Sequence, residues 1–335
     1  MNSKIYSLQY LRAFAALWVL LTHVLQRLDM KPNGIAFAGQ WGVDIFFLLS
    51  GFIIYLTTKD YSSWKAFTIK RIFRIYPAYL LCLILYTAYR VVYDGTVYNA
   101  VTIIQNILMI PFSGPIGFKS LIVGQAWSTC YELYFYALLT ILLLLGISKR
   151  RLLPVILVLF AIGFGLNRIL PMKGFVGYLY SLIGAYHIFF FCEGIVIALL
   201  YDIIQNIKID RTILIIVSVL ALFAYVAVLC TRYNFYLSLL ISPLMFCIVY
   251  KANEVLIGKG LVHRVMLALG DASFSIYLIH SVVIRFLLNQ CHINNFTLLL
   301  CSTLAVTIVL SLLSYHLVEK KFIDLGKKLS LKVVN

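Results

Sequence analysis

The chain has 335 residues, of which 63% are hydrophobic and only 12% are charged. Soluble globular domains contain about half apolar and about a quarter charged residues, so this composition excludes that class. It also excludes a disordered chain, a collagen-like repeat and a disulfide scaffold. Long apolar runs recur along the sequence, which indicates an all-α integral membrane protein rather than a membrane barrel with short alternating strands.

Crossing a bilayer as a helix takes roughly 20 predominantly apolar residues, and runs of that length predict about ten transmembrane helices. We expect a single membrane domain over residues 1–335, with a core near 8–322 and no fused periplasmic domain. The apolar segment 100–112 is too short to cross and ends in a proline-rich stretch, so we interpret it as an interfacial or re-entrant helix. The expected spans lie near 8–28, 39–58, 74–93, 124–146, 152–170, 178–200, 212–230, 234–250, 270–289 and 296–317.

The formal net charge is +16, from 28 Lys and Arg against 12 Asp and Glu. With ten spans, most of these cations fall in loops on the side that holds both termini, as in the clusters Lys70–Arg74 and Lys149–Arg151. Cytoplasmic loops of membrane proteins carry such an excess of Lys and Arg. The sequence therefore predicts cytoplasmic N- and C-termini and explains the charge without a nucleic-acid partner.

Ionisable residues inside a membrane span are costly and indicate a function by default. A structural hydrogen bond between helices, or a side chain that snorkels to the interface, is the alternative for each of them. Within the expected spans they are His23, Asp44, Glu132, His187, Glu193 and His280, with Arg12, Arg285 and His316 near span ends.

Arg12 and His23 are 11 residues apart, which places them on one face of the first expected helix, about 16 Å apart along its axis. Asp44 lies near the outer end of the next helix, at a depth similar to that of His23. A carboxylate that accepts from one imidazole nitrogen fixes the tautomer and leaves the other nitrogen as a base. We therefore expect Asp44 to orient His23, either for deprotonation of a hydroxyl or for a proton relay.

Two more clusters carry charge. Lys70, Arg71 and Arg74 lie at the cytoplasmic mouth of the third expected span, where they could bind phosphate groups or simply act as a topology signal. Glu132 follows Trp127 within the fourth span, and a charged carboxylate there must face the bundle interior. The sequence contains no Walker, GxGxxG, HExxH, GxSxG or CxxC motif, and its seven cysteines have no metal-binding spacing. We expect no metal.

Six segments together resemble, in order, the motifs of the membrane acyltransferase 3 family. The opening segment is most similar to the exopolysaccharide acetyltransferase branch of that family. The segments are Leu8–Ala13 continuing to His23, Gly42–Phe52, Arg71–Pro77, Trp127-Ser128 followed by Glu132, Ser273–His280, and Glu319–Phe322.

The resemblance implies transfer of an acyl group, usually acetyl, from cytoplasmic acyl-CoA to a carbohydrate hydroxyl at the bacterial inner membrane. The acceptor would be an exopolysaccharide, a lipopolysaccharide or a lipid-linked precursor, and acetyl-CoA would be a co-substrate rather than a permanently bound cofactor. The expected catalytic residues are His23, Asp44 and Glu132. The residues expected to bind the CoA phosphates are Arg12, Arg71 and Arg74.

Other functions remain compatible with these residues. A proton-coupled transporter or flippase of a glycan or lipid-linked substrate could use His23, Asp44 and Glu132 as a relay. A structural or sensory membrane protein would need no CoA. All of these functions share the membrane lipids as partners.

Overall fold

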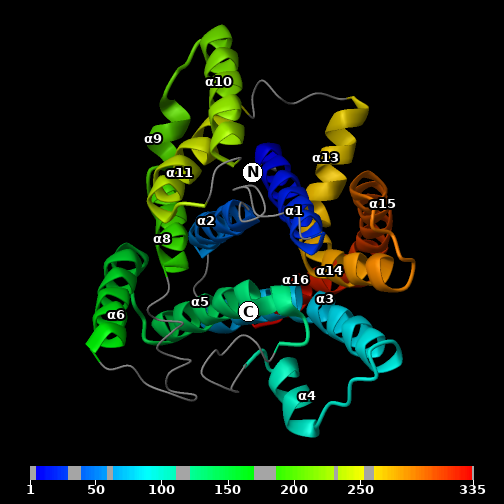
Figure 1. The fold of residues 1–335 in the computed structure, drawn as a ribbon. Helices are drawn as coiled ribbons and strands as arrows, with labels where there is room; N and C mark the ends of the chain where they lie inside the picture. Colours follow the sequence, from blue (N-terminus) through cyan, green and yellow to red (C-terminus); the bar gives the residue numbers. More distant parts are fainter. Residues whose placement is uncertain are drawn as a thin grey trace. The chain divides into compact units, whose positions relative to one another are not determined.

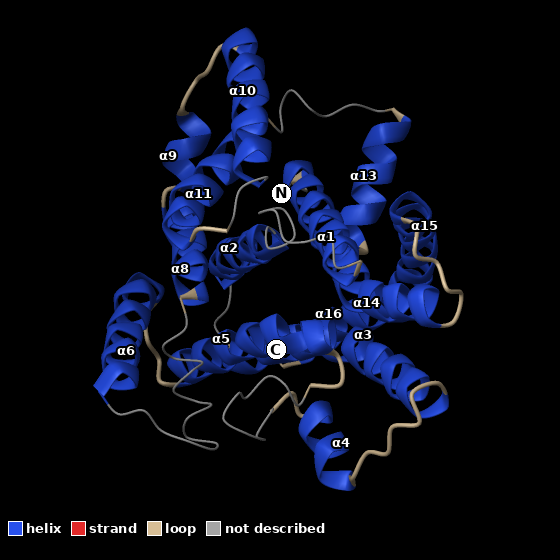
Figure 2. Cartoon of the chain, in the orientation of Figure 1, coloured by secondary structure: helices blue, strands red, loops and turns tan. Residues whose placement is uncertain are grey.

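The computed structural model describes residues 5–28, 39–58, 63–110, 121–169, 186–229, 233–252 and 260–333. All regular secondary structure in these ranges is helical, as Figure 2 shows, which confirms the all-α prediction. The chain divides into two compact units, each made from two stretches of sequence. Unit 1 comprises Met1–Leu56 and Phe189–Tyr315, and unit 2 comprises Thr57–Ile188 and His316–Asn335.

Unit 1 contains the N-terminal helices and most helices of the second half of the chain (Figure 1). They are α1 (Tyr6–Arg27), α2 (Gly39–Thr57), α8 (His187–Leu199), α9 (Tyr201–Asn206), α10 (Arg211–Leu229), α11 (Phe235–Lys251), α13 (Leu261–Asp271), α14 (Ser273–Asn289) and α15 (Phe296–Ser314). The last residue of α2 and the first two of α8 are assigned to unit 2.

Glycines set the helix packing in unit 1. A Cβ on Gly42 would lie 2.8 Å from the carbonyl oxygen of Ala15, so α2 approaches α1 more closely than any other residue allows. A Cβ on Gly194 of α8 would collide with the carbonyl oxygen of Leu48 in α2. Small residues at helix contacts are usual in membrane proteins, where backbones associate by close van der Waals packing.

Unit 2 is built around a long helix, α3 (Trp64–Val92). The Ser63 side chain caps its N-terminus by accepting from the Ala66 amide at 3.4 Å. A Cβ on Gly326 would lie 2.6 Å from the Cβ of Phe73, which brings α16 against α3. The other elements of this unit are α4 (Ala100–Ile107), the short 3₁₀ helix η4 (Gly124–Ala126), α5 (Trp127–Leu144), α6 (Lys149–Ile169), the π-helical turn η5 (Tyr315–Glu319) and α16 (Lys320–Lys332). The first residue of η5 is assigned to unit 1.

Five described helices are long and apolar enough to cross a membrane, and a sixth span is possible if α13 and α14, bent by 75° at their junction, count as one. They are Tyr6–Arg27, Gly39–Thr57, Trp64–Val92, Gly124–Leu144 and Phe296–Lys332. Shorter apolar helices occupy parts of the other expected spans, and residues 178–185 lie outside the described ranges. Ten spans and cytoplasmic termini therefore stay predictions, whereas the helix expected within 100–112 is short, as predicted.

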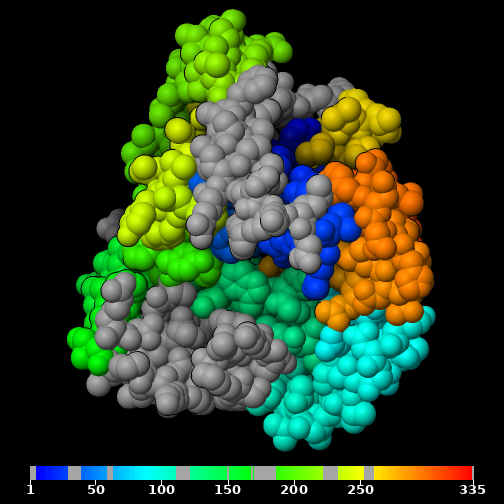
Figure 3. Space-filling model, in the orientation of Figure 1, coloured from blue at the N-terminus to red at the C-terminus, as the bar shows by residue number. Residues whose placement is uncertain are grey.

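Part of the outer surface of unit 1 is apolar. The orange atoms of α14 and α15 are visible on it in Figure 3. Exposed side chains on α15 include Leu298, Val306, Val309 and Leu313. Apolar side chains on an outer helix face are expected where that face contacts lipid.

Candidate functional site

His23 pairs with a second histidine rather than with a carboxylate. Its Nδ1 lies 2.8 Å from Nε2 of His280, which comes from α14 within the same unit. The two ring planes differ by 17°, and the ring centroids are 4.9 Å apart. His280 is completely buried, whereas His23 is only partly buried. Nδ1 of His280 in turn lies 3.1 Å from the carbonyl oxygen of Ile276, one turn earlier in α14.

The predicted pairing of Asp44 with His23 is wrong. Asp44 is completely buried and accepts hydrogen bonds from Ser238 at 2.6 Å, Tyr233 at 2.9 Å and Gln40 at 3.3 Å. His23 makes no hydrogen bond to it in the described part of the chain. Asp44 therefore joins α2 to the start of α11.

Helix geometry explains this error. Gly42 faces α1, and Asp44 follows it by two residues, or about 200° around α2. The inference that α1 and α2 are adjacent is correct, but Gly42 lies level with Ala15 and Val19 rather than with His23, and the Asp44 side chain points to the opposite face. The glycine that brings α2 close to α1 thus also directs Asp44 away from it.

Glu193 is a neighbour of Asp44 that the sequence left without a role. It lies on α8, and the charge of Asp44 acts on its carboxyl group. Its Oε2 is buried without a hydrogen-bond partner among the described residues. No group of three or more His, Cys, Asp or Glu residues suitable for a metal ion occurs in the described ranges.

Arg12 lies on α1, which is continuous from Tyr6 to Arg27 and so preserves the predicted offset of about 16 Å from His23. Its side chain is mostly buried, with a relative exposure of 9%. A buried arginine within a membrane helix is rare and has to be compensated by polar partners.

Unit 2 gathers the other three predicted residues around one tyrosine. Glu132 and Tyr136 are one turn apart on α5, and the Tyr136 hydroxyl donates to the Glu132 carboxylate. The Arg71 guanidinium lies 5.3 Å from the Tyr136 ring centroid, and the charge of Arg74 also acts on Tyr136. The cluster Arg71–Arg74–Glu132–Tyr136 thus combines two cations, one carboxylate and one phenol.

Arg71 is held on several sides. Its Nη2 donates to Oγ1 of Thr57 at 2.9 Å, and its guanidinium lies 5.3 Å from the ring centroid of Phe67. Its Nε is buried and has no hydrogen-bond partner among the described residues. An oriented guanidinium with an unused donor is suited to an anionic group such as phosphate.

Sequence reasoning missed Tyr136 as a member of this cluster. The signal was the spacing of four residues from Glu132, which puts the two side chains on the same helix face. His187, in contrast, is surrounded by aromatic rings and belongs to a packed cluster. The ring centroids of Trp127, Tyr131 and Tyr186 lie 5.0, 5.4 and 4.0 Å from that of His187.

The order of these motifs along the chain can be compared with known families. A family model described as an acyltransferase domain, that of the acyltransferase 3 family, matches residues 5–316. The chain belongs to this family. No curated protein and no solved structure gives a significant match. Membership of the acyltransferase 3 family identifies the protein as a membrane acyltransferase and covers both histidines of the His23–His280 pair.

Proposed function

We propose that this acyltransferase moves an acetyl group from acyl-CoA to a hydroxyl of a cell-surface polysaccharide or of its lipid-linked precursor. The family match supports the reaction class, and the His23–His280 pair is the observation that carries the assignment of the site. The setting we propose is the bacterial inner membrane, with several membrane crossings and both termini in the cytoplasm.

His23 is the general base in this proposal. The acceptor hydroxyl gives its proton to the imidazole while its oxygen attacks the thioester carbonyl, and the carbon–sulfur bond then breaks. CoA leaves as a thiolate, which takes up the proton. A positioned base of this kind contributes about 10²- to 10⁴-fold to a reaction rate. The partial exposure of His23 beside a fully buried partner supports this role.

Arg71 and Arg74 bind phosphate groups of CoA in unit 2, and Arg12 has the same role in unit 1. The buried and unused Nε of Arg71 supports this assignment, because an anionic oxygen would satisfy it. Glu132 orients a substrate group together with Tyr136, whose hydroxyl donates a hydrogen bond to the Glu132 carboxylate. Asp44 anchors α11 to α2 and is not proposed as the partner of His23.

Mass spectrometry of surface glycans tests the proposal. Cells with the gene, without it, and with His23→Ala are compared at equal protein level. We expect an increment of one acetyl group per acceptor site only with the intact gene. A transporter or flippase would change the amount or the location of a glycan but not its mass, so an unchanged mass in cells that make the protein and the acceptor would overturn the proposal.

A further inference from the structure

We propose that His280 is a positioning residue that holds His23 in the tautomer with its proton on Nδ1, so that Nε2 is the basic nitrogen. The tautomer follows from hydrogen bonds within unit 1 alone. Only its use in catalysis rests on the proposed function.

The first step is the proton on His280. Its Nδ1 lies 3.1 Å from the Ile276 carbonyl oxygen. A carbonyl oxygen can only accept a hydrogen bond, so Nδ1 of His280 is the donor and carries a proton. In a neutral imidazole the other nitrogen is then an acceptor, which makes Nε2 of His280 an acceptor.

The second step is the neutral state of His280. The ring is completely buried, and a buried charge without a counter-ion is costly. No carboxylate is hydrogen-bonded to either histidine in the described chain, and Asp44 accepts from Ser238 of α11.

The third step is the proton on His23. The 2.8 Å contact between Nδ1 of His23 and Nε2 of His280 needs one proton, and His280 does not supply it. Nδ1 of His23 is therefore the donor. Nε2 of His23 keeps its lone pair and makes no hydrogen bond among the described residues. This order of donors runs from His23 through His280 to the backbone of α14.

For acyl transfer, this hydrogen bond determines which nitrogen of His23 acts as the base and how its ring is oriented. The hydrogen bond from Nδ1 to His280 fixes the rotation of the His23 ring, so Nε2 receives the hydroxyl proton. The imidazolium that forms still donates through Nδ1 to His280. Partners that fix the tautomer and orientation of metal-ligating histidines are worth about 10- to 100-fold in affinity or activity, and we expect a similar magnitude for the partner of His23.

The tautomer can be measured without any activity assay. Protein labelled with ¹⁵N at histidine and reconstituted in lipid is examined by NMR at a pH where imidazole is neutral, because protonated and unprotonated ring nitrogens have distinct shifts. The His23 signals are those lost in His23→Ala, and His292→Gln, at an exposed residue, is the matched control for removing one histidine. We expect a protonated Nδ1 and an unprotonated Nε2 at His23.

Two variants of His280 complete the test. His280→Gln can place an amide oxygen at the position of Nε2, where it accepts from His23. The tautomer of His23 should then be retained, and kcat should stay within about threefold of the wild-type value. His280→Leu removes the acceptor, and we expect His23 to shift toward the tautomer protonated on Nε2, with kcat about 10- to 100-fold lower and KM for acetyl-CoA unchanged.

The outcomes separate the two proposals. A wild-type His23 protonated on Nε2, or a tautomer that does not change in His280→Leu, overturns the positioning role. A His280→Leu variant with an altered His23 tautomer and the full kcat also overturns the positioning role, since the orientation of His23 would then not affect the reaction rate. If the tautomer behaves as described but the wild-type protein transfers no acyl group, the proposed function fails while the structural inference holds. Thermal unfolding of each variant verifies that it is folded.

Discussion

Replacing Asp44 by alanine should destabilise unit 1 and leave the chemistry of His23 intact. The substitution removes the acceptor of two hydroxyls, that of the buried Ser238 and that of the partly buried Tyr233. Each unpaired buried polar group costs about 1–3 kcal/mol, which gives an upper range of about 2–6 kcal/mol. Ser238 has a second partner in Ser242 at 3.3 Å, and removal of a buried carboxyl group recovers part of the loss. We therefore expect a loss of about 2–4 kcal/mol in the free energy of unfolding.

Equilibrium unfolding in mixed micelles measures this loss. Asp44→Asn retains an acceptor oxygen and should lose less. A double-mutant cycle with Tyr233→Phe should give a coupling energy of about 0.5 kcal/mol or more, because the two side chains share a hydrogen bond. Acyl transfer per folded molecule and the His23 tautomer should stay unchanged in all three variants. An Asp44→Ala protein as stable as the wild type would refute the anchoring role. A folded variant with an altered His23 tautomer would instead restore the orienting role.

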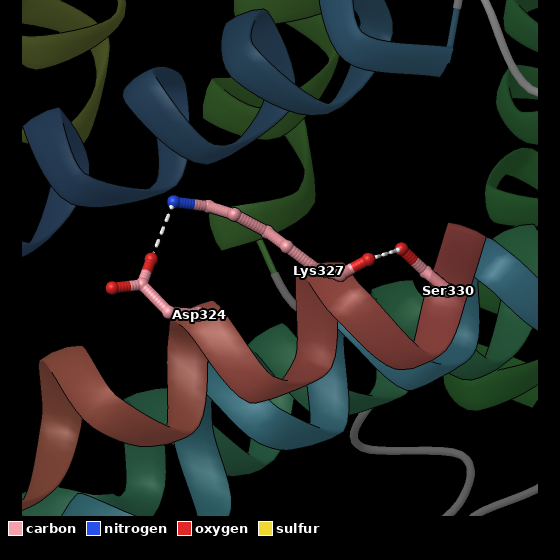
Figure 4. A network of polar contacts seen from close by, with 3 residues as sticks. All are labelled: Asp324, Lys327 and Ser330. Carbon is pink, nitrogen blue, oxygen red and sulfur yellow. Dashed lines mark hydrogen bonds and ion pairs between the residues drawn. The ribbon is translucent and has the colours of Figure 1, made fainter. Parts of the chain in front are cut away.

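Three further substitutions probe the rest of the structure. Arg71→Lys should raise KM for acetyl-CoA about 10-fold with little change in kcat, because a lysine cannot provide the planar set of donors, and equal values in steady-state kinetics would contradict phosphate binding. Gly194→Ala places a Cβ against the backbone of Leu48, so we expect a lower Tm and a lower yield of folded protein, and an unchanged Tm would mean that α2 and α8 are less closely packed than described. Asp324→Ala removes an exposed ion pair with Lys327 at 3.0 Å on α16 (Figure 4). Exposed ion pairs contribute little to stability, so Tm should not change measurably. A clear decrease in Tm would show that this pair stabilises the folded protein.

Composition was sufficient to predict the fold class, because a chain with so many apolar residues can satisfy its backbone in lipid only as helices or as a closed barrel. Span counting was less certain. The helix α11 (Phe235–Lys251) is apolar but shorter than a full crossing, and hydropathy alone does not distinguish such a helix from a span. The bend between α13 and α14 was not predicted either, since Ala272 at the junction carries no sequence signal for a break.

Sequence reasoning named six candidate site residues but mispaired one of them. Position in the expected helices predicted a similar depth for His23 and Asp44, whereas Gly42 of α2 in fact lies against Ala15 and Val19 of α1. The direction of a side chain depends on which face packs against which neighbour, and that was set by Gly42 and by the partners of Asp44 on a helix almost 200 residues later. His280 was recognised as ionisable and buried, but its contact with His23 joins residues far apart in the chain, which no local pattern predicts.

The proposal that His23 is the base of an acyl transfer is tested most directly with purified protein in lipid vesicles. Acetyl-CoA labelled in its acetyl group is supplied together with a glycan extract that contains free hydroxyls, and both free CoA and labelled glycan are measured. The account predicts equal amounts of the two products with the wild-type protein and a loss of about 10²-fold or more with His23→Ala in its folded state. Transfer at the wild-type rate by folded His23→Ala would contradict it.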